Sequence, residues 1–429
     1  MKKYSEMTRE ELLFEKESTE KRYSEKKALG LKLDISRGKP CPEQLALSLP
    51  MLDLVNSKTE NFKCENGFDI RNYGVIDGIP ECRRLFGEIL DAPTENVIVT
   101  GNSSLNLFYD LIAHAMCHGL PGGKAPWCEC KERKLLCPAP GYDRHFAVGE
   151  LFGFELITVP MNSDGPDMDM VEELIKDENV KGIICVPKYS NPQGISYSEE
   201  VVERFAKLSP AASDFRIFWD NAYAVHDLYS DKKDTLADIF ALAREYDNED
   251  IVFYFASTSK ISFPGSGVAI FAASVNNLKQ IKPIMGVQTI GFDKINQIRH
   301  VKYFKSAANI HDHMADLAKI IRPKFEIVLE ILSEHLDGTG IATWTKPVGG
   351  YFVSLNVMDG TAKETYRLAK EAGVTLTDVG ATYPYGIDPR DSNIRIAPTF
   401  PSNDELMAAM EVLVCCTKLA ATKKLLGII

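Results

Sequence analysis

Residues 251–271 read IVFYFASTSKISFPGSGVAIF. An apolar run of the kind that forms a buried strand ends in three small hydroxyl residues, and Lys260 follows them directly. An ammonium group is costly to bury unless it is paired or loses its proton. Because a lysine without its extra proton is a nucleophile, this pattern predicts a functional lysine at the end of a buried strand.

Similar apolar runs alternate with helical patterns from about residue 97 onward. The predicted strands are NVIVTG (96–101), KLLCPAPGY (134–142), FELITVPM (154–161), VKGIICVPKYSNPQG (180–194), FRIFWDNAY (215–223) and the two runs at 251–260 and 267–274. Segments with helical spacing of apolar residues lie between them, for example at 103–116, 168–180 and 199–209. This alternation indicates an α/β fold, with a mostly parallel sheet covered by helices on both faces.

The C-terminal part of the chain has a different pattern. Amphipathic helices are predicted at 322–336 and 402–426, and strand-like runs at 349–357 and 393–400 lie between them. This order is typical of a smaller α+β domain. The extended segment LKLDISRGKP (31–40) has no sheet of its own nearby, so we expect the N-terminal arm to pack with that domain. The expected division is an arm with part of the small domain at 1–50, a large domain at 51–305 and the small domain at 306–429.

Length, charge and hydropathy exclude several functional classes. A chain of 429 residues is long enough for two domains. The net charge of −11 argues against a nucleic-acid partner, because affinity for phosphate backbones comes mainly from clustered lysine and arginine. No apolar run reaches the length of a membrane span, and the charged segment 1–27 has no apolar signal region. We therefore expect a cytoplasmic protein without a membrane or nucleic-acid partner.

Ten cysteines are scattered along the chain, and reduced thiols in the cytosol suit a protein of this size better than disulfides. One group, Cys117, His118, Cys128, Cys130 and Cys137, has the residue types of a zinc site. Its C-x-C spacing differs from the usual C-x₂-C, and Cys137 falls in a strand-like run. We interpret the group as a surface excursion with free thiols and expect no metal site.

Polar residues follow the predicted strands at the points where the strands end. In open α/β sheets, ligands bind beyond the carboxyl ends of the strands. Taken singly, such residues have ordinary explanations, since an aspartate can cap a helix and NPQG can be only a turn. The strand-end residues are Gly101, Asn102, Ser103, Ser104, Gly141, Tyr142, Asn191, Pro192, Gln193, Gly194, Asp220, Asn221, Ala222, Tyr223, Ser257, Thr258, Ser259 and Lys260.

These residues suit one ligand when they are taken together. The turn GNSS (101–104) opens a helix, whose free backbone N–H groups suit a phosphate. An aromatic ring at Tyr142 can cover a planar group, and Asp220 can pair with a protonated ring nitrogen. Tyr223 and Asn191 can hold a phenolic oxygen, and Lys260 can form an imine with an aldehyde. Pyridoxal 5′-phosphate has all of these features.

The sequence resembles the fold-type I, class I/II aminotransferases from about residue 30 to the C-terminus. STSK resembles the Schiff-base motif, which implies Lys260 as the imine lysine and Ser257 as a phosphate ligand. DNAY resembles the Asp-x-x-Tyr pair, which implies Asp220 on the pyridine nitrogen and Tyr223 on the phenolic oxygen. NPQG resembles the Asn-Pro-x-Gly element, which implies Asn191 on the same oxygen. Lys260, Asp220 and Tyr223 are therefore the expected catalytic residues.

The resemblance implies the remaining site residues as well. PAPGY places Tyr142 where the family stacks an aromatic ring on the cofactor, and GNSS matches the phosphate turn at Gly101, Asn102 and Ser103. Two segments imply substrate binding: NIRIAPTF gives Arg395 for the α-carboxylate, and SRGKP gives Gly38 beside it.

A further segment, NYGVIDGIPECRRLF, bears on the oligomeric state. It resembles a family element whose tyrosine, here Tyr73, reaches the phosphate of the neighbouring subunit. This implies a homodimer with active sites at the interface.

One segment departs from the family pattern. Members usually carry an arginine shortly after the lysine, in a Pro-Gly-x-Arg pattern, to neutralise the phosphate. Here the segment reads FPGSGVA, with Ser266 and Gly267 at that place. SRGKP and SKISFPGSGVA are similar to a divergent branch that includes aspartate aminotransferases and the aminotransferase-like domain of MocR-type regulators.

The resemblance implies an aminotransferase that moves an amino group between an L-amino acid and a 2-oxo acid. Aspartate or glutamate would need a cation for the second carboxylate, and 291–305 offers Lys294, Arg299, His300 and Lys302, although a solvated helix face explains them too.

Two other functional classes stay open. The same scaffold also carries C–S lyases, decarboxylases and racemases. A non-catalytic regulator that binds the cofactor is a further alternative, although the residues before 31–40 are few and mixed in charge for a DNA-binding domain.

Overall fold

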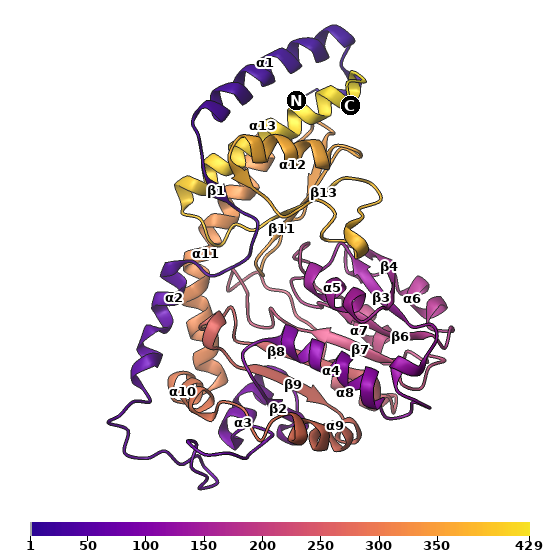
Figure 1. The fold of residues 1–429 in the computed structure, drawn as a ribbon. Helices are drawn as coiled ribbons and strands as arrows, with labels where there is room; N and C mark the ends of the chain where they lie inside the picture. Colours follow the sequence, from indigo (N-terminus) through magenta and orange to yellow (C-terminus); the bar gives the residue numbers. More distant parts are fainter. Residues whose placement is uncertain (1) are drawn as a thin grey trace.

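The computed structural model describes residues 2–429. A large lower part is built around an eight-stranded sheet, and a smaller upper part carries both ends of the chain (Figure 1). The sheet order is β2-β9-β8-β7-β6-β3-β4-β5. The strands are β2 (Val97–Val99), β3 (Lys134–Ala139), β4 (Glu155–Asn162), β5 (Gly165–Pro166), β6 (Val180–Cys185), β7 (Arg216–Asp220), β8 (Val252–Ser257) and β9 (Ala269–Ala273).

The sheet is mostly parallel, as the alternating pattern predicts. β8, β7, β6, β3 and β4 pair in parallel, in that order. β9 is the exception among the strands of the predicted parallel run, since it pairs antiparallel with both β8 and β2. Only residues 258–268 connect β8 to β9, and they contain a single short 3₁₀ turn, η6 (Pro264–Ser266). A connection this short cannot hold the crossover helix that a parallel neighbour requires.

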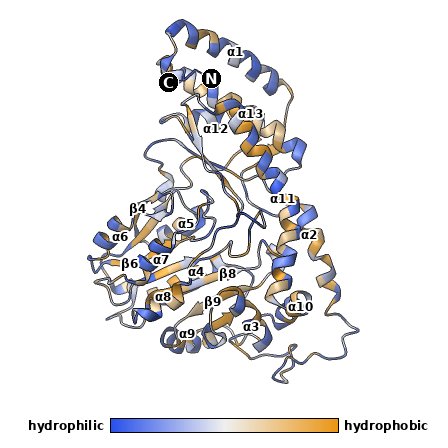
Figure 2. Ribbon diagram, turned by 180° about the vertical axis from the view of Figure 1, so that it is seen from behind, coloured by the Kyte–Doolittle hydropathy of each residue, from blue (hydrophilic) through white to orange (hydrophobic). Residues whose placement is uncertain are grey.

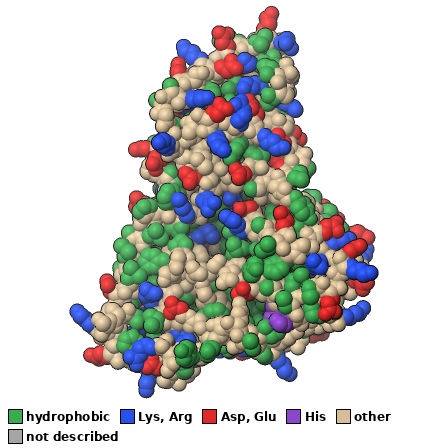
Figure 3. Space-filling view, viewed as in Figure 1, with side chains coloured by type: hydrophobic (Ala, Val, Ile, Leu, Met, Phe, Trp, Pro, Cys, Tyr) green, Lys and Arg blue, Asp and Glu red, His purple; other side chains and the backbone are tan. Residues whose placement is uncertain are grey.

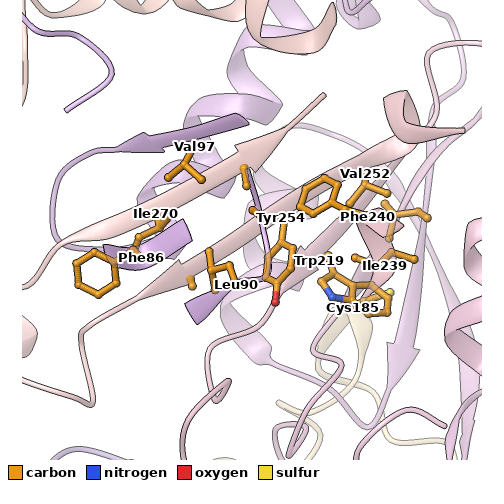
Figure 4. Packing of buried hydrophobic residues seen from close by; sticks show 14 of the residues in the cluster. Phe86, Leu90, Val97, Cys185, Trp219, Ile239, Phe240, Val252, Tyr254 and Ile270 are labelled. Carbon is orange, nitrogen blue, oxygen red and sulfur yellow. The ribbon is translucent and has the colours of Figure 1, made fainter. Parts of the chain in front are cut away.

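Both faces of the sheet are buried. Along β8, Val252 and Tyr254 enter one core cluster, while Phe253 and Phe255 enter another on the opposite face. Figure 4 shows the first cluster, in which Tyr254 lies among side chains from neighbouring strands and helices. Successive side chains along a strand point to opposite faces of the sheet. An unbroken apolar run therefore needs helices packed on both faces.

Helices of the lower part provide that cover. Helix α4 lies over the aromatic face of β8 and β9, and α3, α7 and α8 contribute to the opposite face. The helices are α2 (Pro42–Ser48), α3 (Pro80–Ile89), α4 (Ser104–His118), α5 (Asp143–Leu151), α6 (Met168–Leu174), α7 (Glu199–Ala206), α8 (Ile239–Glu245), α9 (Val275–Gln288) and α10 (Lys294–Phe304).

The upper part has an α+β layout. Its three-stranded sheet has the order β10-β11-β13 and is antiparallel throughout. A separate short pair joins β1 to β12. The elements are α1 (Arg9–Ala28), β1 (Leu33–Asp34), α11 (Ala307–Leu336), β10 (Ala342–Trp344), β11 (Val353–Val357), α12 (Ala362–Glu371), β12 (Val374–Thr375), β13 (Asn393–Ile396) and α13 (Asn403–Leu425).

The N-terminal arm packs with the C-terminal region, as expected from its extended segment. Leu33 pairs in parallel with Val374, and the hydroxyl of Tyr23 donates to the carbonyl of Leu368 at 3.1 Å. Helix α1 lies along α13 and is mostly hydrophilic (Figure 2). Most residues in the second half of α13 are buried. A capping box formed by Thr8 and Glu11 starts α1.

Helix α11 joins the two parts. Its first half places Ile310 and Met314 in a core of the lower part, and its second half places Phe325 and Leu332 in the upper core. The expected boundary at 305/306 falls just before this shared helix, and the exact domain limits stay a prediction.

The cysteine group at 117–137 has no metal-site geometry within residues 2–429, where no three potential ligands come together. All ten thiols are free, and Cys137 is buried in β3 while Cys117 and Cys128 are exposed. Among the helices of residues 2–429, none is both long and apolar enough to cross a membrane.

Candidate active site

A cavity of about 830 Å³ opens where the carboxyl ends of β3, β6, β7 and β8 face the upper part. Figure 3 shows lysine and arginine side chains gathered around a hollow between the two parts. Most of the residues predicted for the site line this cavity. They are Gly38, Ser103, Tyr142, Asn191, Asp220, Tyr223, Ser257, Lys260 and Arg395.

Lys260 lies in the turn after β8. Its Nζ is 4.9 Å from the ring centroid of Tyr223 and 5.8 Å from that of Tyr351. Within the described chain no carboxylate approaches it closely enough for an ion pair. Burial lowers the pKa of its ammonium, while the charge of Asp220 acts in the opposite direction. A lysine with a lowered pKa is more readily the neutral, nucleophilic amine.

Asp220 ends β7 and is almost fully buried. Its Oδ2 lies 3.1 Å from Nε2 of His145, a side chain only 1% exposed on α5. Its Oδ1 has no hydrogen-bond partner in residues 2–429. A buried carboxylate oxygen without a donor is unfavourable, so this atom suits a ligand that brings an N–H group, such as a protonated ring nitrogen.

His145 is a site residue that the sequence reasoning missed. It lies three residues after Tyr142 in the first turn of α5, which directly follows β3. The one sequence signal for His145 was its position shortly after the strand-end motif PAPGY. Its proximity to Asp220 depends on packing between β7 and α5, which local spacing does not reveal.

The start of α4 lies at one end of the cavity. Ser103 is the residue before the helix, and its side chain makes no capping hydrogen bond. The Ser257 hydroxyl donates to Ser259 at 3.0 Å, and Ser259 donates to the carbonyl of Asn102 at 3.2 Å. Free backbone N–H groups at a helix start and neighbouring hydroxyls form a suitable cradle for a phosphate.

Two predicted members of this turn do not line the cavity. Gly101 and Asn102 lie beside it, and the side chain of Asn102 is exposed and donates to the carbonyl of Pro264 at 3.2 Å. Their geometry shapes the turn that presents Ser103 to the cavity.

The missing arginine after Lys260 has a steric explanation. A Cβ on Gly267 would lie 2.7 Å from Oγ1 of Thr258, which also accepts a hydrogen bond from the backbone of Val268. A side chain at this position would therefore displace the turn that carries Lys260.

Arg395 on β13 lies at the other end of the cavity. Its Nε donates to Thr377 at 3.3 Å, and its Nη1 contacts Asn191 at 3.2 Å and Asp143 at 2.9 Å. The guanidinium lies 5.0 Å from the ring of Phe352. A Cβ on Gly38 would lie 2.6 Å from the Phe352 ring, so the absence of a side chain lets the N-terminal segment pack against that ring. A fixed guanidinium fork matches a carboxylate in two-point geometry.

Two tyrosines form a wall of the cavity. Burial raises the pKa of Tyr142 to about 12, and its ring meets the edge of His145 with centroids 4.9 Å apart. Tyr223 is 2% exposed, stacks on Tyr351, and has a pKa raised well above its ordinary value by burial. Both phenols therefore stay protonated near neutral pH and can act as donors.

The cations of α10 do not line this chain's cavity. Lys294 donates to the carbonyl of Phe292, and His300 is fully buried between Ser262 and the carbonyl of Asn296. The cations that do line the cavity, apart from Lys260 and Arg395, are Arg37, Lys39, Arg144 and Lys370. Tyr73 is 76% exposed and lies outside this chain's cavity.

Comparisons with known proteins find relatives over nearly the whole chain. A family model described as aspartate amino-transferase matches residues 7–428. A putative aminotransferase of Mycolicibacterium smegmatis is 46% identical over 99% of both chains. The crystal structure of an aspartate transaminase from Corynebacterium glutamicum superposes with a TM-score of 0.95 at 43% identity, covering 97% of this chain and 98% of that one.

A more distant structure shares the fold. It is an α-aminoadipate aminotransferase from Thermus thermophilus, solved in complex with N-(5′-phosphopyridoxyl)-L-leucine. Its TM-score is 0.74 at 20% identity, over 95% of each chain.

Proposed function

Because the chain belongs to the aspartate aminotransferase family, we propose that it uses pyridoxal 5′-phosphate to move an amino group between an L-amino acid and a 2-oxo acid. Aspartate and glutamate are the proposed amino donors. Lys260 is the proposed point of attachment for the cofactor's aldehyde.

The arrangement of three groups in one cavity carries this proposal. Lys260 has a lowered amine pKa, Asp220 has a buried oxygen without a protein donor, and Arg395 offers a guanidinium fork. These groups match, in turn, an aldehyde, a protonated pyridine nitrogen and a substrate carboxylate. The helix start at Ser103 matches the phosphate.

When bound, pyridoxal phosphate supplies an aldehyde for amino groups and a ring that withdraws electrons from the substrate's Cα. Asp220 would accept a hydrogen bond from the ring nitrogen, and His145, 3.1 Å from the other carboxylate oxygen, would help to position it. Arg395 would hold the α-carboxylate and so position the substrate in the cavity. The Nζ of Lys260, whose lowered pKa favours the neutral amine, would take the Cα proton and later return it.

Cations on the cavity wall support a dicarboxylate substrate. Lys39 and Lys370 have their Nζ atoms 3.8 and 5.8 Å from the rings of Phe400 and Tyr366, and neither has an acidic partner in the described chain. Arg144 contacts an acid only at 4.0 Å.

The acids on the same wall, Asp34 and Asp378, accept hydrogen bonds from Ser36 and Tyr366. Six lysines and arginines and four aspartates line the cavity in the described chain, so cations exceed acids there, which favours binding of a second carboxylate. If alanine, aromatic or branched donors react clearly faster than aspartate and glutamate, the dicarboxylate assignment is wrong.

Two further proposals concern the assembly and its compartment. We propose a homodimer in which the exposed Tyr73 contributes to the partner's phosphate site. We also place the enzyme in the cytoplasm, where ten unpaired cysteines are compatible with reducing conditions.

An absorbance experiment tests the central proposal. Purified protein with added cofactor should absorb in the band of a protonated imine, and Lys260→Ala should lose that band while it keeps its far-ultraviolet circular dichroism. One amino acid added alone should convert the cofactor to pyridoxamine phosphate. Release of ammonia with the cofactor unchanged would indicate a lyase, and no reaction with any amino acid would favour a non-catalytic protein.

A further inference from the structure

Arg395 already holds a carboxylate in this structure, and that carboxylate belongs to the protein. Its Nη1 donates to Oδ1 of Asp143 at 2.9 Å and to Oδ1 of Asn191 at 3.2 Å. Nε donates to Thr377, while Nη2 has no hydrogen-bond acceptor within residues 2–429. Half of the fork is therefore occupied by Asp143 and half is free.

Asp143 has no evident structural task that would explain this contact. It is the first residue of α5, but Tyr142 is the capping position and no side chain caps the helix. Besides Arg395, its carboxylate approaches only the Nε of Arg144, at 4.0 Å. Its side chain is 28% exposed, so it can turn toward solvent without disturbing the core.

We infer that Asp143 is an internal competitor for the substrate α-carboxylate at Arg395. The inference rests on the proposed role of Arg395 in carboxylate binding. Two-point binding of a substrate carboxylate uses both terminal nitrogens of the fork, so Asp143 must leave Nη1 when substrate binds. Two carboxylates at one nitrogen repel each other, which weakens substrate binding and favours product release.

This exchange affects the bound substrate and the transition state equally, because the carboxylate does not react. Uniform binding changes the KM and leaves kcat nearly constant. The Asp143 side chain therefore sets the concentration range in which the enzyme works. An orienting role for Asp143 predicts the opposite sign, since loss of the orienting contact would weaken carboxylate binding.

The test uses the holoenzyme and succinate, a dicarboxylate without an amino group. Asp143→Asn should bind succinate roughly tenfold more tightly than the wild type and show a similarly lower KM for aspartate, with kcat within about twofold. Asp378→Asn removes one charge from the same cavity without contacting Arg395, and its effect should be clearly smaller. In an Arg395→Lys background, Asp143→Asn should no longer tighten succinate binding.

Unchanged or weaker succinate binding by Asp143→Asn overturns the inference. Tightening of equal size in the Arg395→Lys background overturns it too, because the effect would then be general electrostatics. Failure of the proposed function is separate: it would appear as wild-type protein that takes up no cofactor, or as Arg395→Lys that binds succinate as the wild type does. Cofactor absorbance and the thermal midpoint of each variant confirm that it is folded.

Discussion

The two oxygens of Asp220 have different surroundings, and His145 is responsible for the difference. Oδ2 lies 3.1 Å from His145 Nε2, whereas Oδ1 finds no hydrogen-bond donor in residues 2–429. The histidine therefore lies against one carboxylate oxygen and leaves the other, which is buried, for a donor that a ligand could bring. Because His145 acts through Asp220 and does not line the cavity, it is a positioning residue.

We expect His145→Phe to lower kcat about 10- to 100-fold, since a polar contact to a charged group contributes about 1.5–3 kcal/mol. Steady-state kinetics with aspartate would measure the effect, and the KM should change much less. His118→Phe, which alters an exposed histidine on α4, is the control. An increase in KM at constant kcat would contradict the positioning role.

The lowered amine pKa of Lys260 has a consequence for stability. Its ordinary value is 10.5, so between the folded and unfolded pKa values the unfolded chain binds more protons than the folded one. The free energy of unfolding of the cofactor-free protein therefore rises with pH through that window. Below the folded-state pKa, Lys260 is charged in both states, and the folded protein bears the full free-energy cost of burying its ammonium.

Lys260→Met removes this cost. At pH 7 the cofactor-free variant should unfold about 2 °C higher than the cofactor-free wild type, and the difference should disappear as the pH approaches 10.5. Differential scanning calorimetry between pH 7 and pH 10.5 measures the unfolding temperatures of both proteins and how their difference changes with pH. Lys363→Met, at an exposed position, should show no such pH dependence. A difference that grows with pH would show that the sign is wrong.

At the scale of elements, the strands and their polar ends were predictable because both signals are local. An apolar run such as 251–256 requires burial on both faces, and the residues after it must turn away from the sheet. The direction of β9 was harder to predict, because it depends on whether residues 258–268 can hold a helix. The role of α10 was also hidden, since spacing does not reveal that Lys294 and His300 face the core.

The turn between β8 and β9 is built around the absence of a side chain at Gly267. A Cβ there would meet Thr258 Oγ1 at 2.7 Å, and that oxygen also contacts Ser262 and the Val268 N–H. We expect Gly267→Ala to lower the free energy of unfolding by about 1–3 kcal/mol, because the crowded turn must shift.

Urea unfolding measures this cost, and cofactor titration should show weaker binding because Lys260 shares the turn. Gly265→Ala is a matched control two residues away, where an added Cβ would meet nothing within 4 Å. Equal stability of the two variants would mean that the turn tolerates a side chain and that the missing arginine has another cause.

At the scale of the whole molecule, the cavity depends on contacts between the two ends of the chain. Gly38 packs against Phe352 and lines the cavity together with Arg395 because β1 pairs with β12, far away in sequence. The extended segment 31–40 predicted that the arm packs with the C-terminal region, but no local pattern identifies β12 as its partner. Helix α11 spans both cores, so movement of the upper part would change the cavity that both parts line.

The proposed dimer predicts that Tyr73 of one chain contributes to the phosphate site of the other. Tyr73 is 76% exposed and lies outside its own chain's cavity, although its motif implies a phosphate contact. We expect Tyr73→Phe to weaken cofactor retention, measured by dialysis and absorbance, while Tyr109→Phe at another exposed position leaves it unchanged. Light scattering should give the mass of a dimer, and a fully active monomer would remove the basis of this proposal.

Mixed dimers distinguish a contribution to the partner's site from a local effect on folding. Lys260→Ala and Tyr73→Phe should each have little activity at limiting cofactor, but a hybrid dimer has one site with both residues intact if Tyr73 acts in the partner's site. If Tyr73 serves the partner, random exchange of subunits should restore about a quarter of the wild-type activity, because half of the dimers are hybrids with one intact site each. If Tyr73 serves its own chain, each site of the hybrid carries one defect, because one chain lacks Lys260 and the other lacks Tyr73. Mixing would then restore nothing, which would contradict the shared site while leaving the roles of Lys260 and Asp220 intact.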